Sequence, residues 1–286
     1  MESPAGKLPA GRGALRLSNV APAVRRSWRW WIRRLAYGGL VVMVATVGGT
    51  FALLNAVKVP KAATPDETSF ICLANVGAGT CGPGNESAAL SGGQNRVALR
   101  YDQIPTVMVQ AVVAAEDRDF FQHNGIDPLG IARALYEDVT NHGGAEQGGS
   151  TITQQYVKLT YLTSKRTLAR KLKEAALAVK LERQLSKQQI LERYLNEVYF
   201  GRGAYGVEAA AGAYFDITIP ATPITVPQAA LLAGLIRSPL TDPTTHATEA
   251  LRRRNGVIDG MAEMGSITAA EAASRPALQC RRRLDL

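Results

Sequence analysis

The sequence predicts a mainly α-helical domain behind a single N-terminal transmembrane helix. The run Leu35–Val57 holds 23 residues without a charged side chain, which is long enough to cross the hydrocarbon core of a membrane. From about Tyr101 onward the apolar residues recur with helical spacing. No alternating strand pattern of useful length is present, so the fold class is mainly α.

The basic charge of the chain is concentrated before the apolar run. Residues 1–34 contain Lys7 and seven arginines against Glu2 alone, whereas the whole 286-residue chain has a formal net charge of +9. This asymmetry predicts a cytoplasmic N-terminal tail and removes the argument for nucleic-acid binding. The tryptophans of "RRSWRWWIRR" are typical of a membrane interface. A cleavable signal peptide is the alternative, but the apolar run exceeds the usual ~7–15 residues and no clear cleavage site follows.

The chain divides into five segments by composition. After the tail and the predicted span comes a segment rich in Gly, Ser, Asn and Pro, typical of a stalk or loop. The predicted segments are a basic tail (1–34), a transmembrane helix (35–57), a stalk (58–97), a helical domain (98–245) and a linker-like segment (246–286). Cys72 and Cys81 could form a disulfide outside the membrane, while three unpaired thiols, Cys280 included, are an equal alternative. No zinc-site spacing is present.

Three helices of the domain have a recognisable apolar pattern. "RTLARKLKEAALAVKLERQ" places apolar side chains on one predicted stripe: Leu168, Leu172, Ala175 and Val179. "KQQILERYLNEVYF" predicts a second stripe: Ile190, Leu191, Tyr194, Leu195 and Val198. The third helix, "TVPQAALLAGLIRSP", is almost wholly apolar and ends before Pro239.

Glu116 is the first candidate for acid–base chemistry. A helix that begins near Pro105 would place Glu116 at its carbonyl end, where the helix dipole disfavours negative charge. We therefore expect its pKa to be raised, which would make it a better proton acceptor than a surface glutamate. The alternative from the residues alone is a solvated, charged turn "EDRD".

The second candidate lies in "RKLKE", where Glu174 follows Arg170 and Lys171 at helical spacing. A surface lattice of ion pairs is the plain alternative. However, basic residues are dense here: Lys158, Lys165, Arg166, Arg170, Lys171 and Lys173. Two distant acids with such a cationic stretch suit a reaction that joins a carboxylate base to a pyrophosphate leaving group.

Between these candidates lies a glycine-rich loop, "NHGGAEQGGSTITQQYVK". It resembles the phosphate loop of nucleotide hydrolases, but Gly149 stands where the lysine is required, which excludes that class. The loop leads into hydroxyl and amide donors of the kind that sugar or phosphate sites use: Ser150, Thr151, Thr153, Gln154 and Gln155.

Five segments together resemble, in order, the five motifs of glycosyltransferase family 51. They are "EDRDFFQHNG", "GGSTITQQYVK", "RKLKEAALAVKLE", "ILERYLNEVYFGRGAYGVEAAA" and "AALLAGLIRSP", and they span about 101–243. The family contains the peptidoglycan glycosyltransferases of class A penicillin-binding proteins and their monofunctional relatives. The resemblance implies a lysozyme-like glycosyltransferase domain at the cell membrane, facing outward, that polymerises lipid II into a nascent β-1,4-linked glycan strand.

The resemblance also implies roles for individual residues. Glu116 would be the base that deprotonates the acceptor 4-hydroxyl, and Glu174 would assist the leaving pyrophosphate or hold its neighbours in place. Basic residues that would contact the phosphates are Lys158, Arg166, Arg170 and Lys171. Further positions in the motifs are Asp117, Phe120, His123, Ser150, Thr151, Gln154, Gln155, Asn196 and Gly201. For the residues of the second and fourth motifs, capping or buried hydrogen bonding is at least an equal alternative to substrate contact.

Partners other than substrate follow from the same resemblance. The segment "IDPLGIARALYEDVTNHGGAEQ" would form a membrane-facing lobe and a mobile loop, with a plain core helix as the alternative. Its apolar residues are Ile126, Leu129, Ile131 and Leu135. Other cell-wall synthesis proteins are candidate partners. No obligatory cofactor and no dedicated metal ligands are expected, although a pyrophosphate can recruit a divalent cation such as Mg or Mn.

The sequence departs from the bifunctional members of the family. It contains neither the S-x-x-K nor the K-T-G motif of a transpeptidase, so we predict glycosyl transfer without β-lactam binding. The segment "LRRRNGVIDGMAEMGSITAAEAA" resembles the linker of bifunctional members, which keeps a truncated bifunctional protein open. Two other functions stay as alternatives: a lysozyme-like hydrolase of the same polymer, and an inactive scaffold tethered to the membrane. The basic cluster argues against the first, and the intact acids argue against the second.

Overall fold

The computed structural model describes residues 23–56, 69–71, 88–90, 95–133, 149–162, 167–275 and 280. The chain divides into two compact units, 1–53 and 54–286. Some sequence predictions lie outside the described residues: a Cys72–Cys81 disulfide, the apolar Leu135, the basic Lys165 and Arg166, and the loop 134–148.

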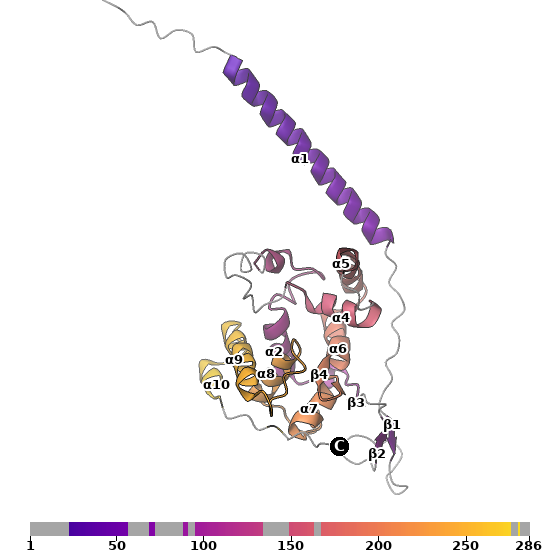
Figure 1. Cartoon of the computed structure of the whole chain (residues 1–286), viewed down its shortest axis with the longest axis vertical. Helices are drawn as coiled ribbons and strands as arrows, with labels where there is room; N and C mark the ends of the chain where they lie inside the picture. Colours follow the sequence, from indigo (N-terminus) through magenta and orange to yellow (C-terminus); the bar gives the residue numbers. More distant parts are fainter. Residues whose placement is uncertain are drawn as a thin grey trace, which may run out of the picture. The chain divides into compact units, whose positions relative to one another are not determined.

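The described residues of the first unit all belong to helix α1 (Ala23–Ala56), drawn in indigo in Figure 1. The helix expected over 35–57 is present as far as Ala56 and begins earlier than expected, at Ala23. In α1 the rings of Trp30 and Trp31 meet edge to face with their centroids 5.3 Å apart. Among the helices that the described residues form, none is both long and apolar enough to qualify as a membrane span. The transmembrane role of this segment stays a prediction.

The second unit is mainly helical, as the sequence predicts (Figure 1). Its helices are η1 (Tyr101–Gln103), α2 (Thr106–Glu116), α4 (Ile152–Tyr161), α5 (Leu168–Glu182), α6 (Lys187–Glu197), α7 (Val207–Phe215), α8 (Val226–Leu235), α9 (Ala247–Glu263) and α10 (Ala269–Ala273). Its strands are two or three residues long: β1 (Ser69–Ile71), β2 (Ala88–Leu90), β3 (Asn95–Arg96), β4 (Tyr199–Gly201) and β5 (Ala204–Tyr205).

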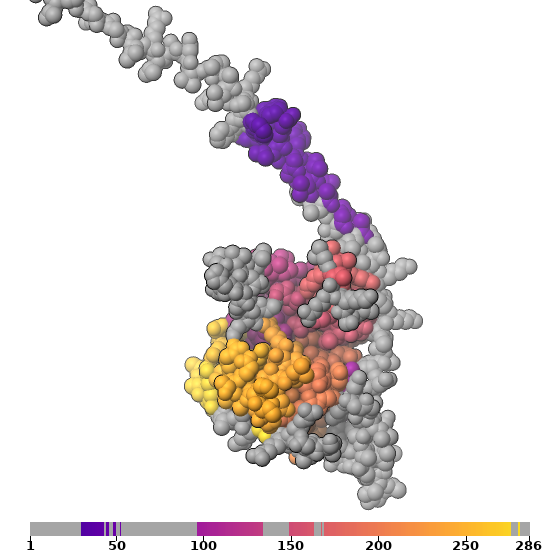
Figure 2. All heavy atoms as spheres, in the orientation of Figure 1, coloured from indigo at the N-terminus to yellow at the C-terminus, as the bar shows by residue number. Residues whose placement is uncertain are grey.

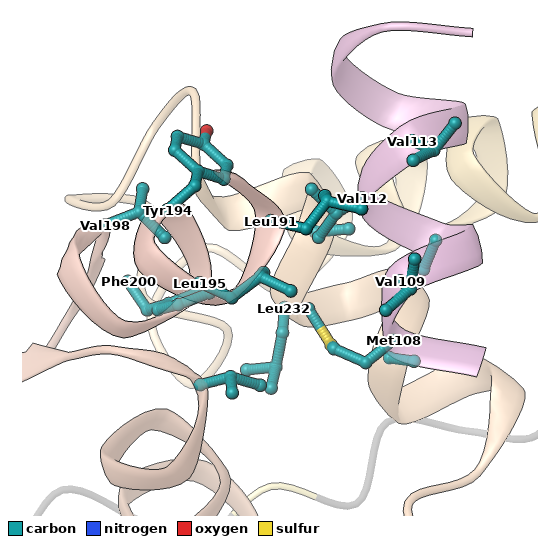
Figure 3. Packing of buried hydrophobic residues seen from close by; sticks show 14 of the residues in the cluster. Met108, Val109, Val112, Val113, Leu191, Tyr194, Leu195, Val198, Phe200 and Leu232 are labelled. Carbon is teal, nitrogen blue, oxygen red and sulfur yellow. The ribbon is translucent and has the colours of Figure 1, made fainter. Parts of the chain in front are cut away.

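Helices α2 and α8 form the centre of the core. Both are apolar around most of their circumference, and such helices are stable only when other elements cover them on all sides. They pack against each other, and α9 packs against both. Figure 3 shows Val109 and Val112 of α2 on the side facing Leu191 of α6 and Leu232 of α8. This packing fixes the C-terminal end of α2, where Glu116 lies.

The predicted stripe of α6 is confirmed, whereas the predicted stripe of α5 is wrong. All five apolar residues predicted for α6 and its C-terminal cap are buried. The buried residues of α5 are instead Glu174, Ala176, Leu177, Ala178 and Leu181, and Leu172 is 52 % exposed. The apolar pattern points to the wrong face because Glu174, a polar residue, is turned inward.

A three-stranded sheet supports the loop that follows α6. Strand β5 lies between β3, to which it is parallel, and β4, to which it is antiparallel. In the β4–β5 turn, Arg202 has φ +54° and donates two hydrogen bonds of 2.8 Å to the carboxylate of Asp242. This ion pair ties the β-turn to the chain after α8 and holds the pKa of Asp242 below its usual range, chiefly through the hydrogen bond from Arg202.

Helix α9 lies inside the segment that the sequence analysis treats as linker-like. It packs along α8 and α2, and its Ala250, Val257, Ile258 and Met261 are buried. In Figure 2 the light orange to yellow atoms of this part of the chain form one folded surface with the darker orange atoms that precede them.

Candidate active site

A cleft of about 1290 Å³ brings together residues from five helices. Its lining comes from the end of α2, from α4 and α5 on one side, and from α8 and α9 on the other. Seven basic and two acidic side chains of the described residues line it. The acids are Glu116 and Glu174, and the bases are Arg118, Lys158, Arg170, Lys171, Arg237, Arg252 and Arg253. The excess of positive charge suits an anionic ligand.

Glu116 is the last residue of α2 and is 5 % exposed. Its Oε1 accepts a hydrogen bond of 3.1 Å from Arg237 Nε, and its Oε2 accepts one of 2.6 Å from Gln155 Nε2. Burial is the largest influence on its pKa and raises it, while Arg237 and Gln155 oppose that rise. A raised pKa is the direction expected from the sequence, and desolvation is its largest cause. The alternative of a solvated turn is wrong for this residue.

The buried hydroxyl of Tyr194 is connected to Glu116 through Gln155. The phenol of Tyr194 on α6 donates a hydrogen bond of 2.8 Å to Gln155 Oε1. Tyr194 is fully buried, and burial raises its pKa well above its ordinary value, so the phenol keeps its proton. Figure 3 shows its hydroxyl oxygen pointing away from Leu195 and Leu232.

Glu174 is the second acid of the cleft and is 2 % exposed. Lys171 Nζ lies 2.6 Å from its Oε1 and also donates a 2.7 Å hydrogen bond to Ser150 Oγ. Lys171 therefore bridges α5 to the residue that precedes the α4 cap. The predicted pairing of Lys171 with Glu174 is present, and it lies in a cleft rather than in a fully solvated lattice.

Asp117 and His123 lie behind the wall of the cleft. The Nε2 of His123 lies 2.9 Å from Asp117 Oδ2, and the same oxygen accepts a 3.0 Å hydrogen bond from the backbone N–H of Ile152. Asp117 thus holds the N-terminus of α4 against the end of α2. Thr151, the N-cap of α4, accepts from the N–H of Gln154 and donates to the carbonyl of Gly125. These four predicted residues are placed to position α4, and none of them is among the cleft-lining residues.

Two other predicted residues lie away from the cleft. Phe120 is fully buried and packs edge to face against Phe121. Asn196 binds the backbone of Leu99 through both ends of its amide, at 2.9 Å and 2.8 Å. Neither geometry supports direct contact with a substrate. Arg166 lies outside the described residues.

Seven predicted site residues line the cleft together: Glu116, Ser150, Gln155, Lys158, Arg170, Lys171 and Glu174. Among the described residues, no group of three or more His, Cys, Asp or Glu side chains could hold a metal ion.

Sequence reasoning missed the basic side chains on the α8–α9 side of the cleft. The most important is Arg237, which contacts Glu116 and also donates a 3.1 Å hydrogen bond to the carbonyl of Ala115. It follows α8 within "AGLIRSP", where a single arginine after an apolar helix was the only signal. Arg252 and Arg253 on α9 share the carboxylate of Glu249. The sequence alone does not identify Arg252 and Arg253 as cleft residues, because a run of arginines such as "LRRRN" usually indicates a solvent-exposed helix face.

Comparisons with known proteins agree on one family. Residues 84–262 match the model of the transglycosylase family. Penicillin-binding protein 1A of Mycobacterium tuberculosis (strain ATCC 25618 / H37Rv) is 40 % identical over 283 residues, which cover 95 % of this chain and 32 % of that protein. Penicillin-binding protein 1A of Aquifex aeolicus (strain VF5) is 47 % identical over 189 residues, 64 % of this chain and 25 % of that protein.

Other similar proteins have the same name. Penicillin-binding protein 1A of Escherichia coli (strain K12) is 44 % identical over 184 residues, 64 % of this chain and 21 % of that protein. A crystal structure of penicillin-binding protein 1A from Haemophilus influenzae is 19 % identical with a TM-score of 0.43, over 78 % of this chain and 22 % of that chain. The chain spans about a third or less of the length of these relatives.

Proposed function

Because the chain belongs to the transglycosylase family, we propose that it is a peptidoglycan glycosyltransferase that polymerises lipid II into β-1,4-linked glycan strands. The observation that carries this proposal is the environment of Glu116. A buried carboxylate, held by Arg237 and Gln155, faces a cleft whose other wall carries Lys158, Arg170 and Lys171. A base and an anion-binding wall in one cleft are what this transfer requires.

The proposed reaction is a single displacement with inversion. Glu116 accepts the proton of the 4-hydroxyl of the acceptor lipid II, and the oxygen attacks C1 of the lipid-linked strand. The bond from C1 to the pyrophosphate oxygen breaks, and its electron pair leaves with undecaprenyl pyrophosphate. The cations of α4 and α5 stabilise the charge that develops on the leaving group. Glu174, paired with Lys171, keeps that lysine directed into the cleft.

Two carboxylates with different partners fit this division of roles. Glu116 is contacted by an arginine and an amide, whereas Glu174 is contacted by a lysine that also binds Ser150. An inverting transfer of this kind forms no covalent enzyme intermediate, so neither acid needs to act as a nucleophile. We also count α9 with the catalytic domain rather than with a linker, since it lines the cleft.

The remaining parts of the proposal concern the membrane. We propose that 35–57 anchors the domain at the outer face of the cell membrane with 1–34 in the cytoplasm. Leu129 and Ile131 are exposed, which favours a lipid-facing role over a core helix for this part of the chain. Leu172, on the exposed face of α5, has the same character.

The test is polymerisation of lipid II by the purified full chain in detergent. The parent should produce long glycan strands, and Glu116→Gln should lower the rate by about 10² to 10⁴. Glu208→Gln is the matched control, because Glu208 is also a buried glutamate but is not among the cleft-lining residues. It should retain the parent rate. Release of muropeptides from purified sacculi, without strand synthesis, would favour a hydrolase instead. Absence of both activities would favour a scaffold.

A further inference from the structure

We infer that Tyr194 is a positioning residue that fixes the orientation of the Gln155 side-chain amide, so that its NH2 group always faces Glu116. The inference rests on the proposed role of Glu116 as the base. Three elements are involved: α2 carries Glu116 at its end, α4 carries Gln155, and α6 carries Tyr194. Tyr194 does not line the cleft, and its hydroxyl reaches Glu116 through the hydrogen bond to Gln155.

The hydrogen bonds form a chain with one direction. Tyr194 donates its phenol proton to Gln155 Oε1, and Gln155 donates from Nε2 to Glu116 Oε2. A glutamine amide has an acceptor at one end and donors at the other, so the two contacts determine each other. If the amide rotated by half a turn, its oxygen would face an ionised carboxylate oxygen at hydrogen-bond distance, which is repulsive.

Tyr194 also disfavours that rotation, through its hydrogen bond to the oxygen end of the Gln155 amide. In the rotated state the phenol oxygen would have to accept from the amide NH2, and the phenol proton would lose its acceptor in a fully buried place. An unsatisfied buried donor costs about 1–3 kcal/mol. The phenol keeps its proton because burial raises its pKa, with Glu116 as a further cause in the same direction.

The consequence for Glu116 is a bias toward the ionised state. With the NH2 group fixed toward it, Glu116 receives a donor that stabilises the carboxylate but not the protonated acid. Without Tyr194 the amide is free to turn its oxygen to a protonated Glu116 and accept its proton. The charged groups that contact or adjoin Glu116 are Arg237 and Asp117. The other charged groups of the same cleft are Arg118 after α2, Lys158, Arg170, Lys171 and Glu174 from α4 and α5, and Arg252 and Arg253 from α9.

The experiment is the pH profile of lipid II polymerisation by the full chain with Tyr194→Phe. This substitution removes only the hydroxyl, and it should move the acidic limb of kcat/KM upward by about 0.5 to 1 pH unit, because a weaker bias toward ionisation raises the pKa of Glu116. On the alkaline side of the limb the rate should approach that of the parent.

Tyr214→Phe is the matched control. Tyr214 is also fully buried and donates its hydroxyl to a backbone carbonyl, that of Phe200 at 2.9 Å, but it has no contact with Gln155. It should leave the acidic limb where the parent has it. In a Gln155→Leu background, Tyr194→Phe should produce no further shift, since the group through which it acts is gone.

The outcomes separate this inference from the proposed function. A parent chain that does not polymerise lipid II refutes the function itself. A parent that polymerises, with Tyr194→Phe lowering the rate equally at every pH or leaving the limb unmoved, refutes the role of Tyr194 while the function stands. An equal shift in Tyr214→Phe would also refute it, because the effect would then be general to loss of a buried hydroxyl.

Discussion

Replacement of Arg237 by methionine should disable Glu116 at acidic pH. The guanidinium Nε lies 3.1 Å from Glu116 Oε1, and at an effective dielectric constant of about 20 a unit-charge pair at this distance interacts by roughly 5 kcal/mol. The Arg237 side chain is 27 % exposed, so water screens part of that energy. An arginine beside a carboxylate commonly lowers its pKa by about 1–3 units. We expect the loss of Arg237 to raise the pKa of Glu116 further, because burial remains and an opposing positive charge is removed.

The sign follows from the proposed role of the base. Glu116 must be ionised to accept a proton, and a raised pKa leaves it protonated to a higher pH. Below the acidic limb of the parent, the rate of Arg237→Met should therefore be about 10- to 100-fold lower, and the two rates should converge as the pH rises. Arg237→Lys, which keeps the charge, should restore part of the difference.

The assay is the pH dependence of kcat/KM for lipid II polymerisation. Arg253→Met is the matched control, because it removes one positive charge from the same cleft and its ion pair is with Glu249 rather than Glu116. Its acidic limb should coincide with that of the parent. If Arg237→Met lowered the rate by the same factor at all pH values, Arg237 would act by binding the substrate anion, and the reasoning from Glu116 would be refuted.

Three further predictions concern stability. Burial raises the pKa of Glu208 from 4.5 to about 7, so the folded protein binds more protons than the unfolded chain between these values and loses stability as pH rises through them. Between pH 5 and pH 8.5, the free energy of unfolding of the parent should fall by up to about 3 kcal/mol more than that of Glu208→Gln. An equal fall in both proteins would contradict this prediction. Asp242→Asn should destabilise the fold by about 3 kcal/mol in denaturant titration, because Arg202 loses its charged partner, and a change within 0.5 kcal/mol would show that the pair is not needed. Gly201→Ala should lower the melting temperature clearly, because Gly201 has φ +97° and an added Cβ would collide with the carbonyl of Pro239; an unchanged temperature would show that the turn can relax.

The sequence predicts best where one local rule decides the outcome. The apolar run after Pro105 is long enough for one helix, so Glu116 falls at its end without any knowledge of the tertiary structure. The same holds for α6, where Leu191, Tyr194 and Leu195 follow the helical period and are all buried.

Prediction fails where a polar residue is turned inward by long-range contacts. In α5 the period of the apolar residues points to Leu172, yet Glu174 is buried because the cleft lies on its side of the helix. Arg237 is 121 positions from Glu116 along the chain, and Gln155 is 39 positions away. No local pattern encodes such distances. The resemblance of motifs identified Gln155 but could not give the direction of its hydrogen bonds, which depends on the buried Tyr194.

The arginines of α9 reach the cleft because a glycine in α8 lets the two helices pack closely. Gly234 is the next-to-last residue of the apolar helix α8. The structure explains why this residue is glycine. A Cβ at this position would lie 3.2 Å from the Cβ of Arg253 and 3.4 Å from the backbone nitrogen of Arg254. The missing side chain lets α9 approach α8 closely and brings Arg253 to the cleft. The close approach of α9 therefore explains why glycine stands at this position of α8. The approaching backbone belongs to "LRRRN", of which Arg252 and Arg253 complete the cationic lining opposite α4 and α5.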